Sequence, residues 1–252
     1  MKQFVLILMA MVSMCTAANA QQNRVKNLST SSKTLNVEML KNTDQRTQIS
    51  RYFFCGYNTL CMPVDVSAQQ LADANLKAER FVAIQQEGND LCLYFVDCTD
   101  QGLEAGVPYL IYASKAQTFY VPGNGTVTEP RSLVMSDSEG NTVRFGSSWQ
   151  SVAKDGLYGI PAQQNTTPLE SILIRTEADK TFLPTRCGFS WEQQSATAKS
   201  LVIRHAMSMA EVNAICNVKA ENANGEVFDL QGRKVTGAQK GIVIENGKKV
   251  KK

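Results

Sequence analysis

The residues of this chain that could do chemistry are first of all its cysteines. Four of them form two pairs with the same spacing, Cys55 with Cys61 and Cys92 with Cys98. This spacing differs from the C-x2-C pairs typical of zinc sites, so we predict no metal centre. Along one strand six residues cover about 20 Å, whereas bridged cysteine Cα atoms lie within about 7 Å. Neither pair can therefore form an internal disulfide without a bend in the strand.

Antiparallel pairing of the two cysteine runs would bring the pairs together. A register that sets Cys55 opposite Cys98 also sets Cys61 opposite Cys92. The even spacing would put all four side chains on one face of the sheet. This register predicts two cross-strand disulfides or a buried thiol ladder. The alternative, which we favour, is that these are ordinary free cysteines in a core, because cysteine is among the most buried residue types.

No other set of residues predicts catalysis. His205 is the one histidine of the chain, and no neighbouring residue would orient it for a Cys-His or Ser-His pair. Asp97, Asp100 and Glu104 lie close in sequence, but their pattern does not distinguish a glycosidase pair from solvated turn charges. We therefore predict no catalytic residue, no metal and no cofactor, and a protein that is not an enzyme.

The elements that must position these residues are short strands. Between residues 46 and 205, apolar runs of four to eight residues recur about every ten residues and are separated by Gly, Asn and Pro turns. This spacing favours an all-β domain, either a β-sandwich or a barrel-like fold. The predicted strands fall within residues 51–66, 80–86, 91–98, 108–114, 118–123, 141–146, 171–176 and 200–205.

One segment of the domain predicts a short helix instead, the sequence SAQQLADANLKAE at residues 67–79. Ser67 can cap it, with Gln70 at the capping-box position. Leu71, Ala74 and Ala78 would share one face of that helix.

The N-terminus predicts export. Residues 1–20 have a lysine near the start, an apolar run and the sequence Ala18-Asn19-Ala20, which is the layout of a signal peptide cleaved after Ala20. Cys15 suggests a lipoprotein anchor as the alternative, but Met14 is larger than the residue expected before an acylated cysteine. The apolar run is shorter than the roughly 20 residues of a membrane span, and we predict no span elsewhere.

Composition divides the rest of the chain into four parts. We predict a polar leader at 21–45, the β domain at 46–205, an Ala/Asn-rich linker at 206–226 and a tail at 227–252. The formal net charge is only +3. Because no basic stripe alternates with aromatic residues, we expect no nucleic-acid partner.

Two segments of the β domain resemble secreted proteins of the Bacteroidetes, of the Bacteroides and Prevotella type. YNTLCMPVDVSAQQL is similar to the family segment W-x-T-L-C-L-P-F-D-V, and LEAGVPYLIYAS is similar to A-G-K-P-Y-L-I. Neither segment carries a known catalytic residue of the family. The matching positions are Cys61, Pro63, Asp65, Ala105, Gly106, Pro108, Tyr109, Leu110 and Ile111.

The tail resembles the end of the C-terminal sorting domains used in type IX secretion. Its sequence VFDLQGRKV…KGIVIENGKKVKK is similar to V-Y-D-L-x-G-R-K-V followed by K-G-I-Y-I-x-N-G-K-K-V. The resemblance implies secretion machinery as a partner and a secreted or outer-membrane surface location, with the periplasm as the alternative. Physically, the tail predicts a two-stranded unit with an Asn-Gly turn, which is marginal in water unless it packs on something else.

These patterns together predict a non-catalytic, secreted or cell-surface β-sandwich protein for binding or surface architecture, with a glycan or a protein as its ligand. One alternative is an adhesin or fimbria-like subunit that assembles by strand exchange through the leader or the tail. Another is a carbohydrate-active enzyme, which needs two carboxylates roughly 5–10 Å apart. Several aromatic residues could line a glycan platform or fill the core, namely Tyr52, Tyr57, Trp149, Tyr158 and Trp191.

Overall fold

The computed structural model of the chain divides into two compact units, Met1–Arg204 and His205–Lys252. The described residues are 25–42, 46–123, 125–160, 173–176, 180–194 and 198–215, with the backbones of three strands between 227 and 251. The predicted signal peptide at 1–20 lies outside them, as do Cys216 and all side chains of the predicted tail.

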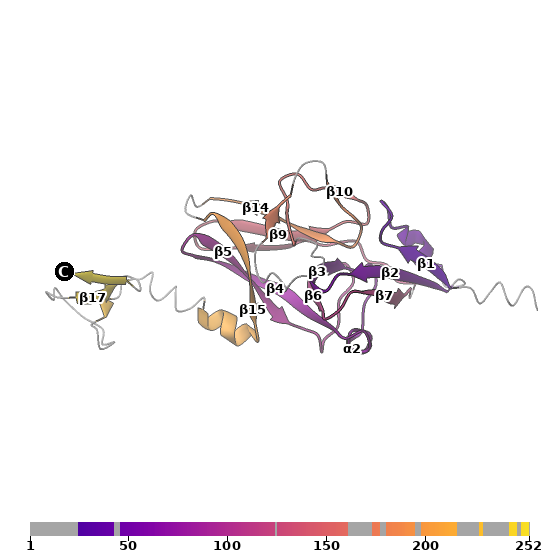
Figure 1. Cartoon of the computed structure of the whole chain (residues 1–252), viewed down its shortest axis with the longest axis horizontal. Helices are drawn as coiled ribbons and strands as arrows, with labels where there is room; N and C mark the ends of the chain where they lie inside the picture. The colour runs from indigo at the N-terminus through magenta and orange to yellow at the C-terminus, as the bar shows by residue number, and fades with distance from the viewer. Residues whose placement is uncertain are drawn as a thin grey trace, which may run out of the picture. The chain divides into compact units, whose positions relative to one another are not determined.

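Two five-stranded sheets form a β-sandwich in the first unit (Figure 1), which confirms the predicted all-β fold. In the first sheet the order is β15 (Ser200–Ala206), β5 (Asp90–Asp97), β4 (Leu76–Glu87), β6 (Pro108–Ala113) and β3 (Gly56–Cys61). In the second sheet the order is β12 (Ile174–Arg175), β11 (Tyr158–Gly159), β14 (Cys187–Glu192), β9 (Thr142–Ser147) and β8 (Leu133–Ser136).

Four phenylalanines hold the two sheets together. Phe81 and Phe95 of the first sheet stack with ring centroids 5.2 Å apart, and Phe145 and Phe189 of the second stack at 4.2 Å. The two pairs meet edge to face across the sandwich, with 5.8 Å between the centroids of Phe95 and Phe145. All four side chains are at most 1% exposed. Each such pair contributes about 0.5–1.5 kcal/mol beyond its buried area, so this cluster fixes how the sheets face each other.

A third sheet carries the predicted leader. β1 (Lys26–Ser29) runs parallel to β2 (Thr47–Phe53), and β2 pairs antiparallel with β7 (Gln117–Pro122). The 3-10 helix η1 (Val37–Leu40) follows β1. Leu28, Leu35 and Leu40 are buried in the same core as the sandwich. The described part of the leader therefore belongs to the first unit because its three leucines pack there.

The predicted helix is confirmed as α2 (Ala68–Asp73), and so is its capping box. The Gln70 N–H donates to Ser67 Oγ at 3.2 Å, and the Ser67 N–H donates to Gln70 Oε1 at 2.8 Å. The helix is shorter than predicted, because Asn75 takes a left-handed φ of +50° and β4 begins at Leu76. Ala78 thus lies on a strand rather than on the helix face shared with Leu71.

Several strands were not predicted from the sequence. β14 contains only two strongly apolar side chains in the run CGFSWE, yet it pairs over its whole length with β9. The sequence also did not predict four other strands, namely β8, β10 (Val152–Ala153), β11 and β13 (Thr181–Phe182). Of these, β10 pairs with β13 in a separate two-stranded sheet. These strands are short, so their pairing partners rather than their own apolar pattern define them.

The second unit differs from its prediction in the number of strands. β16 (Val227–Phe228), β17 (Ile242–Glu245) and β18 (Lys248–Lys251) form one three-stranded antiparallel sheet instead of a two-stranded unit. The run predicted as one strand forms both β17 and β18, because Glu245 pairs with Lys248 and the Asn-Gly dipeptide lies between them. The described part of the predicted linker contains a helix at 209–215. Of the described helices, none has the length and apolar character that a membrane crossing requires.

Candidate functional site

The cysteines of the sequence prediction do not lie opposite one another. β3 pairs with β6, whereas β5 pairs with β4 and neighbours β15, so two strands separate β5 from β3. The register that would set Cys55 against Cys98 and Cys61 against Cys92 is therefore wrong. All four are free cysteines in the structure, with Cys55 exposed and the other three buried.

Burial makes the interior thiols chemically inert. It raises the pKa of the Cys61 and Cys98 thiols to about 12 and that of Cys92 to about 11. Burial likewise raises the pKa of Cys187, which is fully buried, well above its ordinary value. Because the thiolate is the nucleophile, thiols held protonated in this way do not act as nucleophiles at neutral pH.

The other predicted candidates are separated in the structure. His205 is exposed near the end of β15, and the Asp97 carboxylate accepts a hydrogen bond from the Thr99 N–H at 2.8 Å. Glu104 forms an ion pair with Arg131. Among the described residues, no group of three or more His, Cys, Asp and Glu side chains is placed to hold a metal ion.

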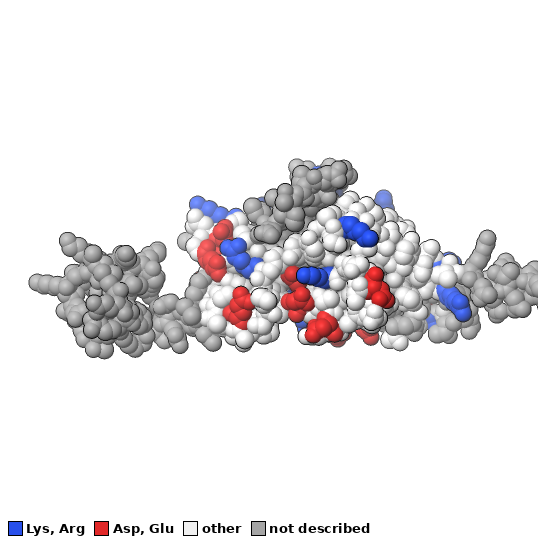
Figure 2. Space-filling view, turned by 60° about the horizontal axis from the view of Figure 1, so that its bottom comes forward, with Lys and Arg blue, Asp and Glu red and all other residues white. Residues whose placement is uncertain are grey.

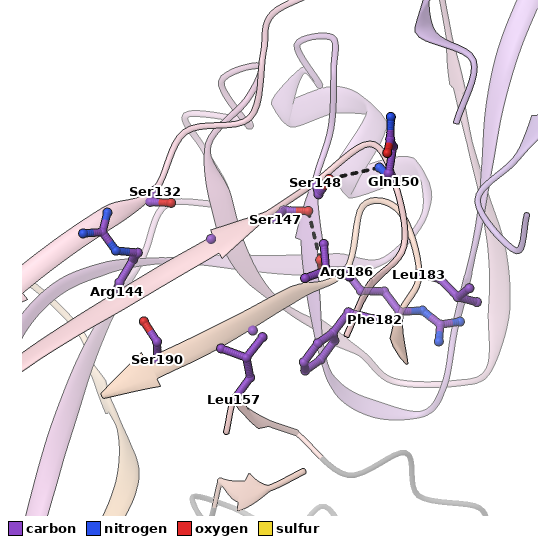
Figure 3. A pocket seen from close by; sticks show the side chains of 13 residues that line it. Ser132, Arg144, Ser147, Ser148, Gln150, Leu157, Phe182, Leu183, Arg186 and Ser190 are labelled. Carbon is purple, nitrogen blue, oxygen red and sulfur yellow. Dashed lines mark hydrogen bonds between the residues drawn. The ribbon is translucent and has the colours of Figure 1, made fainter. Parts of the chain in front are cut away.

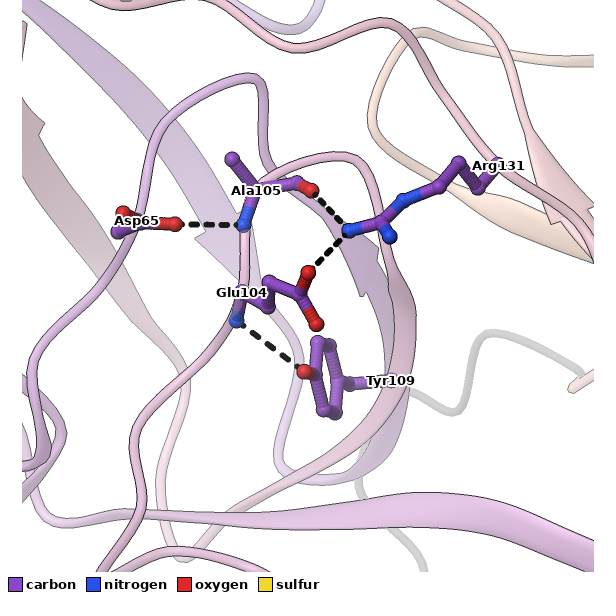
Figure 4. Close-up of polar contacts among 5 residues, drawn as sticks. All are labelled: Asp65, Glu104, Ala105, Tyr109 and Arg131. Atoms are coloured by element: carbon purple, nitrogen blue, oxygen red, sulfur yellow. Dashed lines mark hydrogen bonds and ion pairs between the residues drawn. The ribbon is translucent and has the colours of Figure 1, made fainter.

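One polar cluster fastens two loops of the first unit, and we call Asp65, Glu104, Ala105, Tyr109 and Arg131 the loop clamp (Figure 4). The Ala105 N–H donates to Asp65 Oδ1 at 2.8 Å. The Glu104 N–H donates to the Tyr109 hydroxyl oxygen at 3.1 Å. Arg131 Nη2 donates to Glu104 Oε1 at 2.6 Å and to the Ala105 carbonyl at 3.0 Å. Each of these contacts joins one group of the chain to another, so the clamp stabilises the loops.

The loop clamp gives a physical reason for the residues that matched the family segments. The two segments lie side by side, because β3 pairs with β6 and Val66 forms a bridge with Leu103. Gly106 has a φ of +77°, and a Cβ at this position would lie 2.3 Å from the Glu129 carbonyl oxygen. The side chains of Asp65 and Tyr109 belong to the clamp itself. These positions therefore have a structural role in the fold.

A different region, the outer pocket, lies on the outer face of the second sheet (Figure 3). Its volume is about 180 Å³. Gly146 of β9 and Gly188 of β14 are among the residues that line it. Apolar side chains from the neighbouring segments form one wall, with Arg144 and Arg186 at either end and several serines between. The apolar residues are Val152, Leu157, Phe182 and Leu183, and the serines are Ser132, Ser147, Ser148 and Ser190.

The floor of the outer pocket exists because two glycines are paired. Gly146 lies directly opposite Gly188 in the antiparallel ladder, and both alternate with core phenylalanines, so they face outward. A Cβ at Gly188 would lie 2.9 Å from the Phe182 ring, and a Cβ at Gly146 would lie 2.6 Å from Ser132 Oγ. Phe182 and Ser132 therefore rest on the glycines and form opposite walls, and larger residues would close the space between them.

Cations gather on the Phe182 side of the outer pocket. Burial lowers the pKa of the half-buried Arg186 guanidinium, and no partner among the described residues reaches its buried Nε atom. Lys154 Nζ lies 4.6 Å from the centroid of the Phe182 ring. The pKa of Lys154 is lowered by burial, then by Arg186 and Lys180. Because burial disfavours the charge of Arg186 and the neighbouring cations disfavour that of Lys154, a bound anion would stabilise this end of the pocket.

The charge distribution elsewhere is different. On the face of the first unit shown in Figure 2, acidic and basic side chains are interspersed among uncharged ones. Opposite charges that alternate in this way give a weak net field, whereas a cluster of one sign attracts ligands of the other. The outer pocket is therefore the stronger candidate for binding.

A strained turn places Arg186 at the pocket. Thr185 has a φ of +67°, an uncommon conformation for a β-branched residue, at a cost of about 1–3 kcal/mol. The Cys61 N–H donates to the Thr185 carbonyl at 2.9 Å, and the hydroxyl of Ser147 donates to the Arg186 carbonyl at 2.9 Å. Contacts from β3 and β9 therefore hold the backbone on both sides of the turn.

Our sequence interpretation assigned no role to the pocket residues, although a signal is present. The sequence R-x-G-x-S occurs at residues 144–148 and again at 186–190. No protein-family model matches the chain, and neither the curated proteins nor the solved structures show a significant match to it. The functional argument therefore depends on the geometry of the pocket.

Proposed function

We propose that this chain is an exported, non-catalytic binding protein whose ligand occupies the outer pocket. The observation that carries this proposal is the pocket itself, in which outward-facing glycines leave a hollow between polar and apolar walls. Ligand sites in proteins are typically concave and largely apolar, with a few placed polar groups. The described residues that line the pocket include serines and arginines but no carboxylate, histidine or cysteine. This composition favours binding over acid-base or nucleophilic catalysis.

A pocket-filling variant tests the binding function. Ser190→Phe would place a ring over the glycine floor, and Ser138→Phe, on an exposed loop, serves as the matched control. We expect a ligand found by screening immobilised glycans and peptides to bind the wild-type chain and the control equally, and Ser190→Phe at least tenfold more weakly. Equal binding by Ser190→Phe would place the ligand elsewhere, and a screen without any ligand would contradict the binding function.

We also propose that the protein acts outside the cytoplasm, either secreted or at the outer-membrane surface, with the periplasm as the alternative. The signal-peptide layout of residues 1–20 and the resemblance of the tail to sorting domains support this location. Secretion machinery would then be the partner of the tail. Fractionation of cells that express the chain with and without residues 227–252 tests this part. Unchanged surface delivery after the deletion would remove the sorting role.

The leader favours a second candidate function, a subunit that assembles by strand exchange. β1 is an edge strand, and residues 34–38 line a wide hollow of about 630 Å³ together with Trp149 and its neighbours. Leu28, Leu35 and Leu40 would fill the same core places when supplied by another copy. In that case unheated gels should show ladders that disappear when residues 25–42 are deleted. A monomer at all concentrations would contradict assembly.

A further inference from the structure

We propose that the outer pocket binds an acidic glycan in an extended orientation, with one acid group at Arg144 and another at Arg186. This inference rests on the proposed binding function and names the chemistry of the ligand. It follows from the symmetry of the two strands that form the pocket floor, from the distance between the two arginines and from the groups that lie between them.

The floor of the pocket is built from the two copies of R-x-G-x-S. β9 and β14 run antiparallel, with Gly146 opposite Gly188 and Arg144 opposite Ser190. The two copies are thus related by an approximate two-fold axis through the glycine pair. Each arginine stands two residues from its own glycine, and the antiparallel direction puts the two arginines at opposite ends of the pocket (Figure 3).

The distance between the arginines suits an extended ligand. Four residues of strand separate their positions, which is roughly 13 Å at 3.3 Å per residue. The two side chains also extend to opposite sides of the pocket, so in this arrangement one small anion such as sulfate does not contact both guanidinium groups (Figure 3). A glycan with acid groups on separate sugars can span them, because its charges are set apart along a stiff chain. The two arginines therefore select for length as well as for charge.

The middle of the pocket suits a sugar ring. The volume of about 180 Å³ corresponds to about six water molecules, which is the room of a single ring rather than of a whole oligosaccharide. The paired glycines provide a flat floor, and Ser132 and Ser190 place hydroxyls where sugar hydroxyls could exchange hydrogen bonds with them. The neighbouring sugars would then extend toward the arginines.

Arg186 supplies the stronger of the two ends. Its half-buried guanidinium has a buried Nε without a partner among the described residues, and Lys154 adds positive charge nearby. A carboxylate or sulfate there would make charge-assisted hydrogen bonds, which are about twice as strong as neutral ones. Arg144 is exposed, so its contribution should be smaller and more sensitive to salt.

Single-stranded nucleic acid, another extended anion, fits this pocket poorly. Its bases require open aromatic faces for stacking. The Phe182 ring packs on Gly159 and Gly188, and Lys154 Nζ lies over it. Because glycine backbone and a lysine already contact this ring, it offers an apolar edge to the pocket rather than a platform for a base.

Isothermal titration of the full chain with trigalacturonate tests the inference. The matched control ligand is the fully methyl-esterified trisaccharide, which keeps the shape and removes the charge. A trisaccharide of neutral sugars that carries sulfate esters instead of carboxylates distinguishes sulfate from carboxylate as the acid group. We expect the acidic trisaccharide to bind at least tenfold more tightly than its ester. Equal binding of the ester would overturn the acidic character of the site.

Arginine variants test the two-ended geometry. Arg186→Gln and Arg144→Gln should each weaken the binding of the acidic trisaccharide, with about a tenfold loss or more for Arg186→Gln. Because the two sites are more than 10 Å apart, the losses in the double variant should add as free energies. Arg204→Gln, on β15 of the other sheet, is the control and should bind as the wild type does. Monogalacturonate is too short to span, so its binding should depend on one arginine alone.

The outcomes separate this inference from the proposed function. If neutral glycans bind the pocket and the arginine variants bind them as tightly as the wild type does, the inference of an acidic ligand is overturned while the binding function stands. If the sulfated trisaccharide binds best and needs both arginines, the inference is supported with sulfate as the acid group. If neither the acidic nor the neutral glycans bind the folded wild-type chain, the inference is overturned, and the screen of peptides alone then decides the binding function.

Discussion

The loop clamp and the outer pocket are both polar regions built around an arginine, but their arginines have different surroundings. Arg131 of the clamp donates to the Glu104 carboxylate and to the Ala105 carbonyl, so groups of the same chain satisfy its charge. Arg186 of the pocket lies among other cations, and its buried Nε has no partner among the described residues. An arginine satisfied within the chain holds loops together, whereas we propose that the arginine without an acceptor at Nε among the described residues binds a ligand.

A third arginine shows that burial alone does not make a binding site. Arg51 is only 4% exposed, and burial lowers the pKa of its guanidinium. However, its Nη atoms donate to the carbonyls of Tyr52 and Thr59, and the guanidinium lies over the Phe53 ring. Carbonyl oxygens thus accept from both Nη atoms of Arg51, although its buried Nε, like that of Arg186, has no partner among the described residues. Arg186 differs from Arg51 in that it lines the outer pocket.

The largest expected loss of stability comes from Gly106→Ala, at the residue that follows Ala105 of the loop clamp. The new Cβ would lie 2.3 Å from the Glu129 carbonyl, at a left-handed φ of +77°. We expect the free energy of unfolding, measured with urea, to fall by more than about 2 kcal/mol. Gly88→Ala is the control, because that glycine is also left-handed but has no atom within 4 Å of the new Cβ. Equal losses in the two variants would contradict the close approach.

Asp65→Ala should produce the next largest loss. The substitution leaves the Ala105 N–H without its carboxylate acceptor, and an unsatisfied polar group of this kind costs about 1–3 kcal/mol. Asp155→Ala, at an exposed position, should change the free energy of unfolding by less than about 0.5 kcal/mol. If urea denaturation gave the same free energy of unfolding for both variants, the hydrogen bond of Asp65 would not contribute to stability.

Arg131→Gln should have a smaller effect. The Arg131–Glu104 ion pair joins side chains that are 50% and 54% exposed, and exposed pairs contribute about 0.2–1 kcal/mol. We expect a loss of stability in that range which shrinks when urea denaturation is repeated in 1 M salt. A loss that is unchanged by salt would assign the effect to the hydrogen bond with the Ala105 carbonyl instead.

The smallest expected change in stability comes from Arg186→Gln, and this variant tests the comparison most directly. The substitution removes a half-buried charge that has cationic neighbours, so the free energy of unfolding should stay within about 1 kcal/mol of the wild type or rise. The measurement is urea denaturation beside Arg131→Gln. A loss of more than about 2 kcal/mol would show that Arg186 supports the fold, as the clamp residues do.

Local patterns predicted the elements that depend on local physics. The capping box of Ser67 and Gln70 was predicted correctly, because its two hydrogen bonds join residues three positions apart. Most of the longer strands were also predicted, because alternation and turn residues are local signals. The leader was harder to interpret, since three isolated leucines in a polar segment do not show that they reach a distant core.

Pairing between strands was not predictable from spacing. The cysteine numbers allowed a register between two runs, but β4 and β6 occupy the positions between β5 and β3. β14 illustrates the same limit, because its pairing with β9 and the burial of Phe189 define it as a strand. Many registers are compatible with one spacing, and the packing of the whole sandwich selects among them.

The sequence by itself determined that the chain is rich in strands, that it contains one capped helix and that R-x-G-x-S occurs twice. Only the tertiary structure decided that these two copies lie opposite each other with their glycines paired and facing outward. It also decided that Phe182 and Ser132 rest on those glycines and leave a pocket between them. The reason is physical: alternation and capping act within a few residues, whereas a pocket needs side chains from segments that only long-range packing brings together.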